Sequence, residues 1–128
     1  MPPSNSKETA SSQDCTRISE LLSRVGDKWS MQVIRTLSAG SMRFNALKRE
    51  IGDISQKMLS STLKTLERDG FISRTVTPVT PPMVEYALTD LGRDLEPAVC
   101  QLADWTLRNA ERIESARQTY DDDAMAAK

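Results

Sequence analysis

The chain has 128 residues, and its 17 Lys and Arg side chains nearly balance 18 Asp and Glu side chains, giving a formal net charge of -1. This length predicts one compact domain with short tails. Because the sequence contains no His, it excludes Ser–His and Cys–His nucleophile pairs, His-ligated zinc and an imidazole proton shuttle. It also lacks a phosphate-binding glycine loop, so we expect a protein that is not an enzyme and that holds no cofactor or metal.

No apolar run approaches the ~18 residues that a membrane-spanning helix needs. The N-terminal stretch also lacks the apolar segment of a signal peptide. We therefore expect a cytoplasmic protein with reduced thiols and no membrane partner. The polar composition of residues 1–14 predicts a flexible N-terminal tail. We expect residues 15–114 to form the folded domain and residues 115–128 to form a fraying helix end and an acidic C-terminal tail.

Four helices are expected in the first half of the domain. The first ends at Gly26, and Asp27 is the predicted cap of the second. A short third helix has Asn45 as its predicted cap, and a tight turn at residues 52–53 separates it from a fourth helix capped by Ser55. The apolar positions that recur at helical spacing are Ile18, Leu21, Leu22, Val25, Trp29, Val33, Ile34, Leu37, Phe44, Leu47, Ile51, Met58 or Leu59, Leu63 and Leu66.

After Gly70 the apolar period changes from 3.6 to 2, which predicts strands over residues 71–76 and 84–88. The connection between them contains three prolines and should be a stiff, exposed loop. Thr89 is the predicted cap of a long final helix over residues 89–114, in which Pro97 either introduces a kink or starts a new helix. The order predicts an α+β, mainly α fold: a winged helix-turn-helix DNA-binding domain with a terminal dimerisation helix.

The fourth helix is the predicted recognition helix. If its leucines pack inward, its outer face carries small and long polar side chains; such a face fits the major groove, where Gln and Lys reach base edges and phosphates. An ordinary solvated helix face is the alternative. The candidate DNA-binding residues are Arg43, Asn45, Ser55, Gln56, Lys57, Ser60, Ser61, Lys64, Arg68 and Arg74.

The charges are segregated along the chain. Residues 43–75 hold seven basic and four acidic side chains, whereas residues 76–128 hold five basic and ten acidic ones. The positive charge therefore coincides with the predicted DNA-binding segment, as contact with phosphates requires.

The final helix has two adjacent apolar stripes, which favour burial against a second subunit, although packing on its own domain is the alternative. A twofold homodimer would place two recognition helices ~34 Å apart on double-stranded DNA and would need a near-palindromic operator.

Cys15 is predicted to lie just before the first helix, where a thiol reacts more readily. A redox-sensing role and an incidental role both stay open. Cys100 falls among apolar residues in the middle of the final helix, where a thiol is usually inert filling.

Several stretches together resemble the HxlR-type bacterial transcriptional regulators, which are winged-helix relatives of MarR. They are a Cys before the first helix, GDKWSMQVIRTL (26–37), RFNALKREI (43–51), ISQKMLSSTLKTLERDGFISR (54–74) and PPMVEYALTDLGRDLEP (81–97). The resemblance implies a homodimer built from the first and last helices, with major-groove reading by residues 55–68. It also implies an oxidant or small-molecule effector in some members, sensed through a Cys at the position of Cys15.

Two departures from the family pattern matter. Met83 stands where the family commonly has an Arg in the wing. Arg49 and Glu50 occupy the region where some redox-active relatives carry a partner Cys, so a disulfide would join two Cys15 residues or Cys15 and Cys100.

We therefore predict a dimeric, sequence-specific DNA-binding transcriptional regulator. Repression is preferred and activation stays open. The alternative is a winged-helix protein-interaction module that does not bind DNA.

Overall fold

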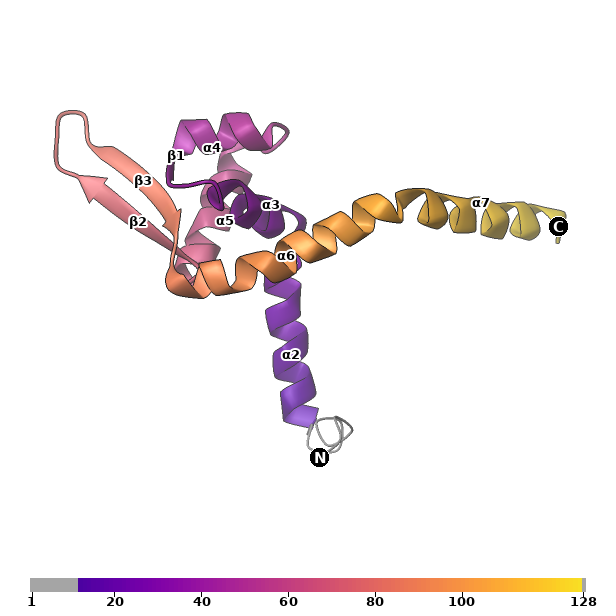
Figure 1. Ribbon diagram of the computed structural model, residues 1–128. Coiled ribbons are helices and arrows are strands. Elements are labelled where there is room, and N and C mark those ends of the chain that lie inside the picture. The colour runs from indigo at the N-terminus through magenta and orange to yellow at the C-terminus, as the bar shows by residue number, and fades with distance from the viewer. Residues whose placement is uncertain (1–11, 128) are drawn as a thin grey trace.

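The computed structural model describes residues 12–127, which form a small winged core with two projecting helical arms (Figure 1). The first arm is α2, and the second is formed by the end of α6 together with α7. The elements are α2 (Ser12–Val25), α3 (Lys28–Leu37), β1 (Met42–Arg43), α4 (Phe44–Ile51), α5 (Gln56–Arg68), β2 (Ile72–Thr77), β3 (Met83–Leu88), α6 (Asp90–Arg108) and α7 (Ala110–Ala126).

Polar side chains start three of the helices, as the sequence predicts. Asp27 accepts hydrogen bonds from the backbone N–H groups of Trp29 and Ser30 at 3.1 Å. Ser55 accepts one from the N–H of Met58 at 3.0 Å, and Thr89 accepts one from a backbone N–H of α6 at 3.1 Å. Each cap satisfies a donor that the first helical turn leaves unpaired, so these helix starts are determined locally.

The core lies where α3, α4 and α5 meet the sheet and the middle of α6. Its buried side chains come from every one of these elements, which ties α5 to the wing and to the long C-terminal helix. They are Val33, Ile34, Leu37, Leu47, Ile54, Leu59, Leu63, Leu66, Ile72, Leu88 and Val99.

The sheet is antiparallel throughout, with strand order β1-β3-β2. Strands β2 and β3 form the predicted wing hairpin, in which Arg74 faces Tyr86 across the ladder. Strand β1 was not predicted; it pairs Met42 with Tyr86 and joins the start of α4 to the wing. A hydrogen bond of 3.0 Å from the Ser41 hydroxyl to the Glu85 carboxylate supports this junction.

Two helix starts differ from the predictions. Helix α2 begins at Ser12, so Cys15 lies inside its first turns and residues 12–14 are helical; residues 1–11 of the predicted tail lie outside the described residues. Asn45 is not a cap, because α4 begins at Phe44 and the cap position is Arg43, whose side chain makes no capping hydrogen bond.

The final helix breaks at Asn109, not at Pro97. Helix α6 continues through Pro97 because Leu95 and Val99 pack on the core on either side of it. The Asn109 side chain and backbone N–H both donate to the Trp105 carbonyl, and the Asn109 carbonyl then accepts the first bond of α7. Residues 115–126 consequently belong to α7, where a fraying helix end and an acidic tail were expected.

None of the helices within residues 12–127 has the length and hydrophobicity that crossing a membrane requires.

Candidate nucleic-acid interface

A sharp turn joins α4 to α5 and sets their helix-turn-helix arrangement. Gly52 ends α4 with φ at +92°, a left-handed conformation that a side chain disfavours. Ile54, 2% exposed, then anchors the turn in the core, and the Ser55 cap begins α5. The glycine turn and the cap together direct the outer face of α5 away from the core.

The two faces of α5 differ sharply in burial. Leu59, Leu63 and Leu66 are buried as predicted, and Thr62 is buried beside them. On the opposite side, four exposed residues follow one another at the spacing i, i+4, i+7, i+11, so that they form one continuous stripe. This basic stripe consists of Lys57, Ser61, Lys64 and Arg68.

The cations of the stripe are available for an external anion. Within the part of the chain that the structure describes, the ion pairs are Arg24–Asp69 and Glu114–Arg117, and neither involves the stripe. An exposed helix face with three unpaired cations attracts phosphate groups. Ser55 and Gln56 are exposed at the N-terminal end of α5, and Ser60 is half-buried on its flank.

A hollow of about 330 Å³ separates α5 from the root of the wing. It brings together the ammonium-bearing Lys64 of α5 and the guanidinium-bearing Arg74 of β2, which the sequence places ten residues apart. The lining residues are Phe44, Ser60, Leu63, Lys64, Glu67, Arg74 and Tyr86. The two cations outnumber the single carboxylate, so the hollow suits a phosphate.

A second polar hollow lies along α4 and adds residues that the sequence analysis missed. It is lined by Asn45, Lys48, Arg49 and Gly52. Asn45 and Arg43 are both exposed, as a DNA contact requires. The spacing of positions 45, 48, 49 and 52 on one helix face was the signal that could have identified Lys48 and Arg49.

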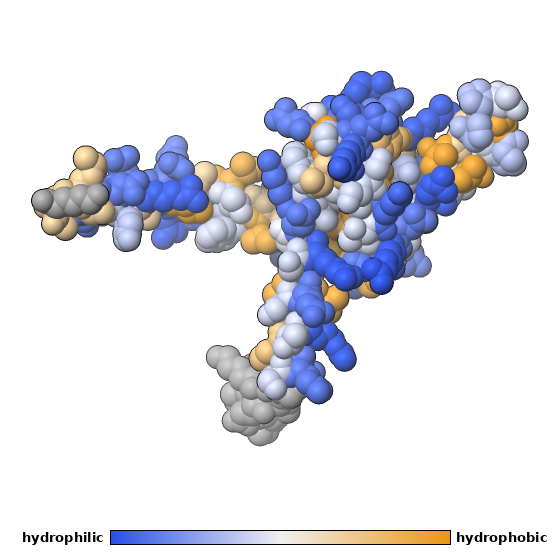
Figure 2. Space-filling model, turned by 180° about the vertical axis from the view of Figure 1, so that it is seen from behind, coloured by the Kyte–Doolittle hydropathy of each residue, from blue (hydrophilic) through white to orange (hydrophobic). Residues whose placement is uncertain are grey.

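The wing tip contributes no charge to this surface. Residues 77–83 contain no ionisable side chain, and Val76 and Val79 are exposed there. Figure 2 shows hydrophobic surface at the wing, at the right of that view. The basic residue closest to the tip on β2 is Arg74, so the positive charge of β2 lies toward the root of the wing.

Both arms carry apolar side chains that no other part of residues 12–127 covers. None of the fourteen residues of α2 is buried, and Ile18, Leu21 and Leu22 are all more than half exposed. Leu102 and Trp105 of α6 are also about half exposed. Figure 2 shows hydrophobic patches along both arms. Exposed apolar faces on this scale are typical of interaction surfaces.

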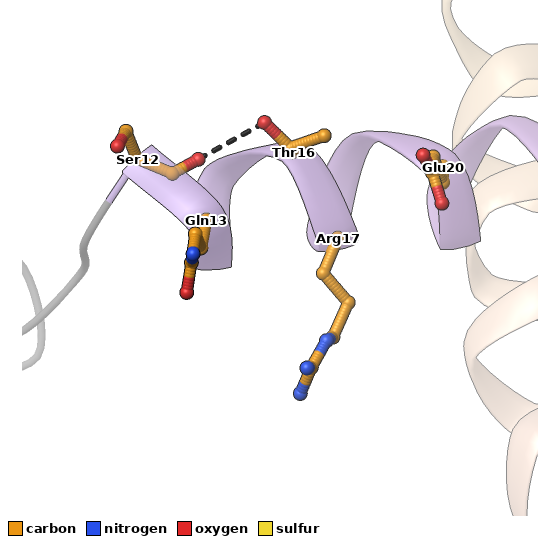
Figure 3. Close-up of a pocket in the computed structure, with 5 residues that line it drawn as sticks. All are labelled: Ser12, Gln13, Thr16, Arg17 and Glu20. Carbon is orange, nitrogen blue, oxygen red and sulfur yellow. Dashed lines mark hydrogen bonds between the residues drawn. The ribbon is translucent and has the colours of Figure 1, made fainter.

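The two thiols occupy different environments. Cys15 is exposed on α2. A shallow surface on the same helix, which Cys15 does not line, is formed by Ser12, Gln13, Thr16, Arg17 and Glu20 (Figure 3). Because no other described element closes over these residues, the described part of the chain does not enclose a site there. The hydrogen bond drawn there, from the Thr16 hydroxyl to the Ser12 carbonyl at 3.0 Å, lies within the helix.

Cys100 is half-buried on α6, and its Sγ donates to the Glu96 carboxylate at 3.2 Å. Burial raises the pKa of the Cys100 thiol, Glu96 raises it further through this hydrogen bond and its charge, and Arg35 partly opposes the shift. Cys100 is therefore held as a neutral thiol at neutral pH. No group of three or more acidic, Cys or His side chains able to hold a metal ion occurs within residues 12–127.

A helix-turn-helix followed by an antiparallel wing defines a winged helix-turn-helix transcriptional regulator. More particularly, the chain belongs to the HxlR-like helix-turn-helix family, whose model matches residues 24–114.

Three comparisons illustrate the relationship. The HTH-type transcriptional regulator YtfH of Escherichia coli, itself uncharacterised, is 42% identical over 98 residues, which cover 77% of this chain and 78% of YtfH. The reduced form of the redox regulator HypR superposes with a TM-score of 0.72 at 38% identity, covering 77% of this chain and 98% of HypR. A transcriptional regulator of the MarR family from Porphyromonas gingivalis superposes with a TM-score of 0.70 at 33% identity, covering 79% and 98% of the two chains.

Proposed function

We propose that this protein is a dimeric, sequence-specific DNA-binding regulator that represses transcription by occupying a promoter. The observation that carries the proposal is the exposed, unpaired basic stripe on α5, directly after the helix-turn-helix turn. Small Ser61 lets the helix approach the groove closely, and Lys57 and Gln56 lie at the N-terminal end of the helix, where base contacts concentrate. Lys64, Arg68 and Arg74 are assigned to phosphates.

The bare apolar faces of α2 and α6 support a homodimer. A second copy is the occupant that covers the same faces on both chains through a twofold axis. Such a dimer presents two α5 helices to successive major grooves, about 34 Å apart. The operator is then near-palindromic double-stranded DNA.

An oxidant effector acting on Cys15 is the regulatory part of the proposal. Its support is the exposure of Cys15 on a helix with a bare apolar face, and the structural similarity to HypR, which is named as a redox regulator. The disulfide forms either between Cys15 and Cys15 of the partner subunit or between Cys15 and Cys100. Non-reducing electrophoresis of wild type, Cys15→Ser and Cys100→Ser after mild oxidant separates these pairings.

The test of DNA binding begins with selection of bound fragments from genomic DNA, with and without oxidant. The operator found is then titrated with Lys57→Ala/Lys64→Ala, which should bind at least tenfold more weakly than wild type. The matched control is Arg112→Ala/Arg117→Ala, which removes the same charge from α7 and should bind as wild type does. Equal affinity of the stripe variant and wild type would reject α5 as the recognition helix.

A protein-interaction module is the competing function. It requires an apolar outer face on α5, whereas Met58, 44% exposed, is the only large apolar side chain exposed on that helix. Binding of a protein partner that is insensitive to salt, together with no selected DNA, would favour this alternative.

A further inference from the structure

Helix α2 is attached to the domain by little packing. None of its residues is buried, and a two-residue joint, Gly26 and Asp27, separates it from α3. In Figure 1 it projects from the core as a separate arm. Few apolar contacts of its own therefore hold its direction, and individual polar contacts at its base carry more weight.

One polar contact joins this base to the recognition helix. Arg24 Nη1 lies 2.7 Å from Asp69 Oδ1, with the two side chains 47% and 14% exposed. Among residues 12–127 this is the one ion pair that connects two different elements, since the other lies within α7. The short distance and the partial burial of Asp69 make it a charge-assisted hydrogen bond with a defined geometry.

Asp69 occupies the point where three functional elements meet. It is the C-cap of α5, and the next residue, Gly70, leads into the wing and accepts a hydrogen bond from the side chain of Thr89, the cap of α6. A carboxylate at the C-terminal, negative end of a helix is unfavourable unless a cation compensates it. Arg24 supplies that cation from α2.

We propose that Arg24 is a positioning residue: its ion pair with Asp69 fixes the direction of α2 relative to α5. This inference rests on the proposed function, because the bare face of α2 is part of the proposed dimer interface. The angle between α2 and α5 then sets the distance between the two recognition helices, and so the half-site spacing that the dimer accepts. Cys15 lies nine residues from Arg24, about 14 Å along a rigid helix, so movement of α2 at Cys15 reaches α5 through the same pair.

The test compares Arg24→Gln, Asp69→Asn, the double variant of both, and the charge-swapped pair Arg24→Asp/Asp69→Arg. Arg17→Gln removes a charge from α2 away from the pair and is the matched control. The first readout is amide hydrogen exchange of the DNA-free protein. The second is affinity for the selected operator and for duplexes whose spacer is changed by one and two base pairs.

Each single variant should speed amide exchange in α2 and in the last turn of α5 by about two- to fivefold, the range of a partly exposed ion pair. The preference for the native spacer should weaken by a similar factor. The double variant should change little more than either single variant, and the swapped pair should restore both readouts toward wild type. The swapped pair also places a cation at the C-terminal end of α5, which stabilises the helix independently of the ion pair.

If Asp69→Asn leaves exchange and spacer preference unchanged, Arg24 only compensates a helix-end charge, and the positioning role is wrong. The same holds if Arg24→Gln behaves like Arg17→Gln. A wild-type protein that binds none of the duplexes would reject the proposed function, and hydrogen exchange would still decide whether the pair holds α2.

Discussion

The salt dependence of DNA binding offers the sharpest test of the assignments on α5 and the wing root. Lys64 and Arg74 line one hollow, and no carboxylate pairs with either of them within the described residues. If both contact phosphates, Lys64→Ala/Arg74→Ala removes two phosphate contacts per subunit and four per dimer. Each contact contributes about 0.9 to the slope of log K against log salt concentration, so the slope should become shallower by about 3.6.

The measurement is a fluorescence-anisotropy titration of the operator duplex between about 50 and 200 mM salt, the range over which counterion release is well resolved. Lys57→Ala serves as a contrast: if this side chain reads a base, specificity among duplexes falls while most of the slope remains. Arg112→Ala/Arg117→Ala controls for net charge and should keep the wild-type slope. An unchanged slope in Lys64→Ala/Arg74→Ala would show that the hollow does not hold a phosphate, and the reasoning would fail.

Four further predictions concern stability and the thiols. Leu63→Ala should lower the free energy of unfolding in urea by about 2–5 kcal/mol because Leu63 is fully enclosed, whereas Val79→Ala at the exposed wing tip should change it by less than about 0.5 kcal/mol. Ser55→Ala should cost about 1 kcal/mol, since the cap of α5 is lost; a variant as stable as wild type would contradict that role. Because burial and Glu96 raise the pKa of Cys100, iodoacetamide should modify exposed Cys15 first at pH 8, as peptide mass spectrometry can show. The raised pKa also means that the stability contributed by the neutral Cys100 thiol is complete below the pKa of the unfolded chain and is lost as pH rises through the folded value.

The features predicted correctly from the sequence are those that depend on neighbouring residues. The caps at Asp27, Ser55 and Thr89 each bond to a backbone N–H two or three residues ahead, so the sequence pattern contains both partners. The polar stripe on α5 follows in the same way from the positions of its leucines. The candidate site was therefore largely predictable once the order of helices and hairpin was recognised.

The features that were missed depend on contacts between distant segments. Strand β1 is only two residues long, and it exists because Met42 meets Tyr86, 44 positions along the chain. Pro97 was expected to disturb the final helix, yet packing of Leu95 and Val99 on the core outweighs one lost backbone hydrogen bond. The break instead falls at Asn109, beyond the core, where the side chain competes for the Trp105 carbonyl.

The arrangement of α7 explains how a chain with net charge -1 can present a basic surface on α5. Residues 121–123 place three aspartates near the end of α7, and Figure 1 shows this helix extending away from α4 and α5. Repulsion between exposed charges falls off over a Debye length of about 8 Å at physiological salt, and residue 121 lies eleven helical positions beyond the start of α7, about 16 Å along it. The acidic end of α7 is thus screened from the basic stripe, even though acidic and basic side chains nearly balance in the net charge of the whole chain. With only a few cations on each α5, one subunit should hold DNA weakly, and tight binding should require both half-sites.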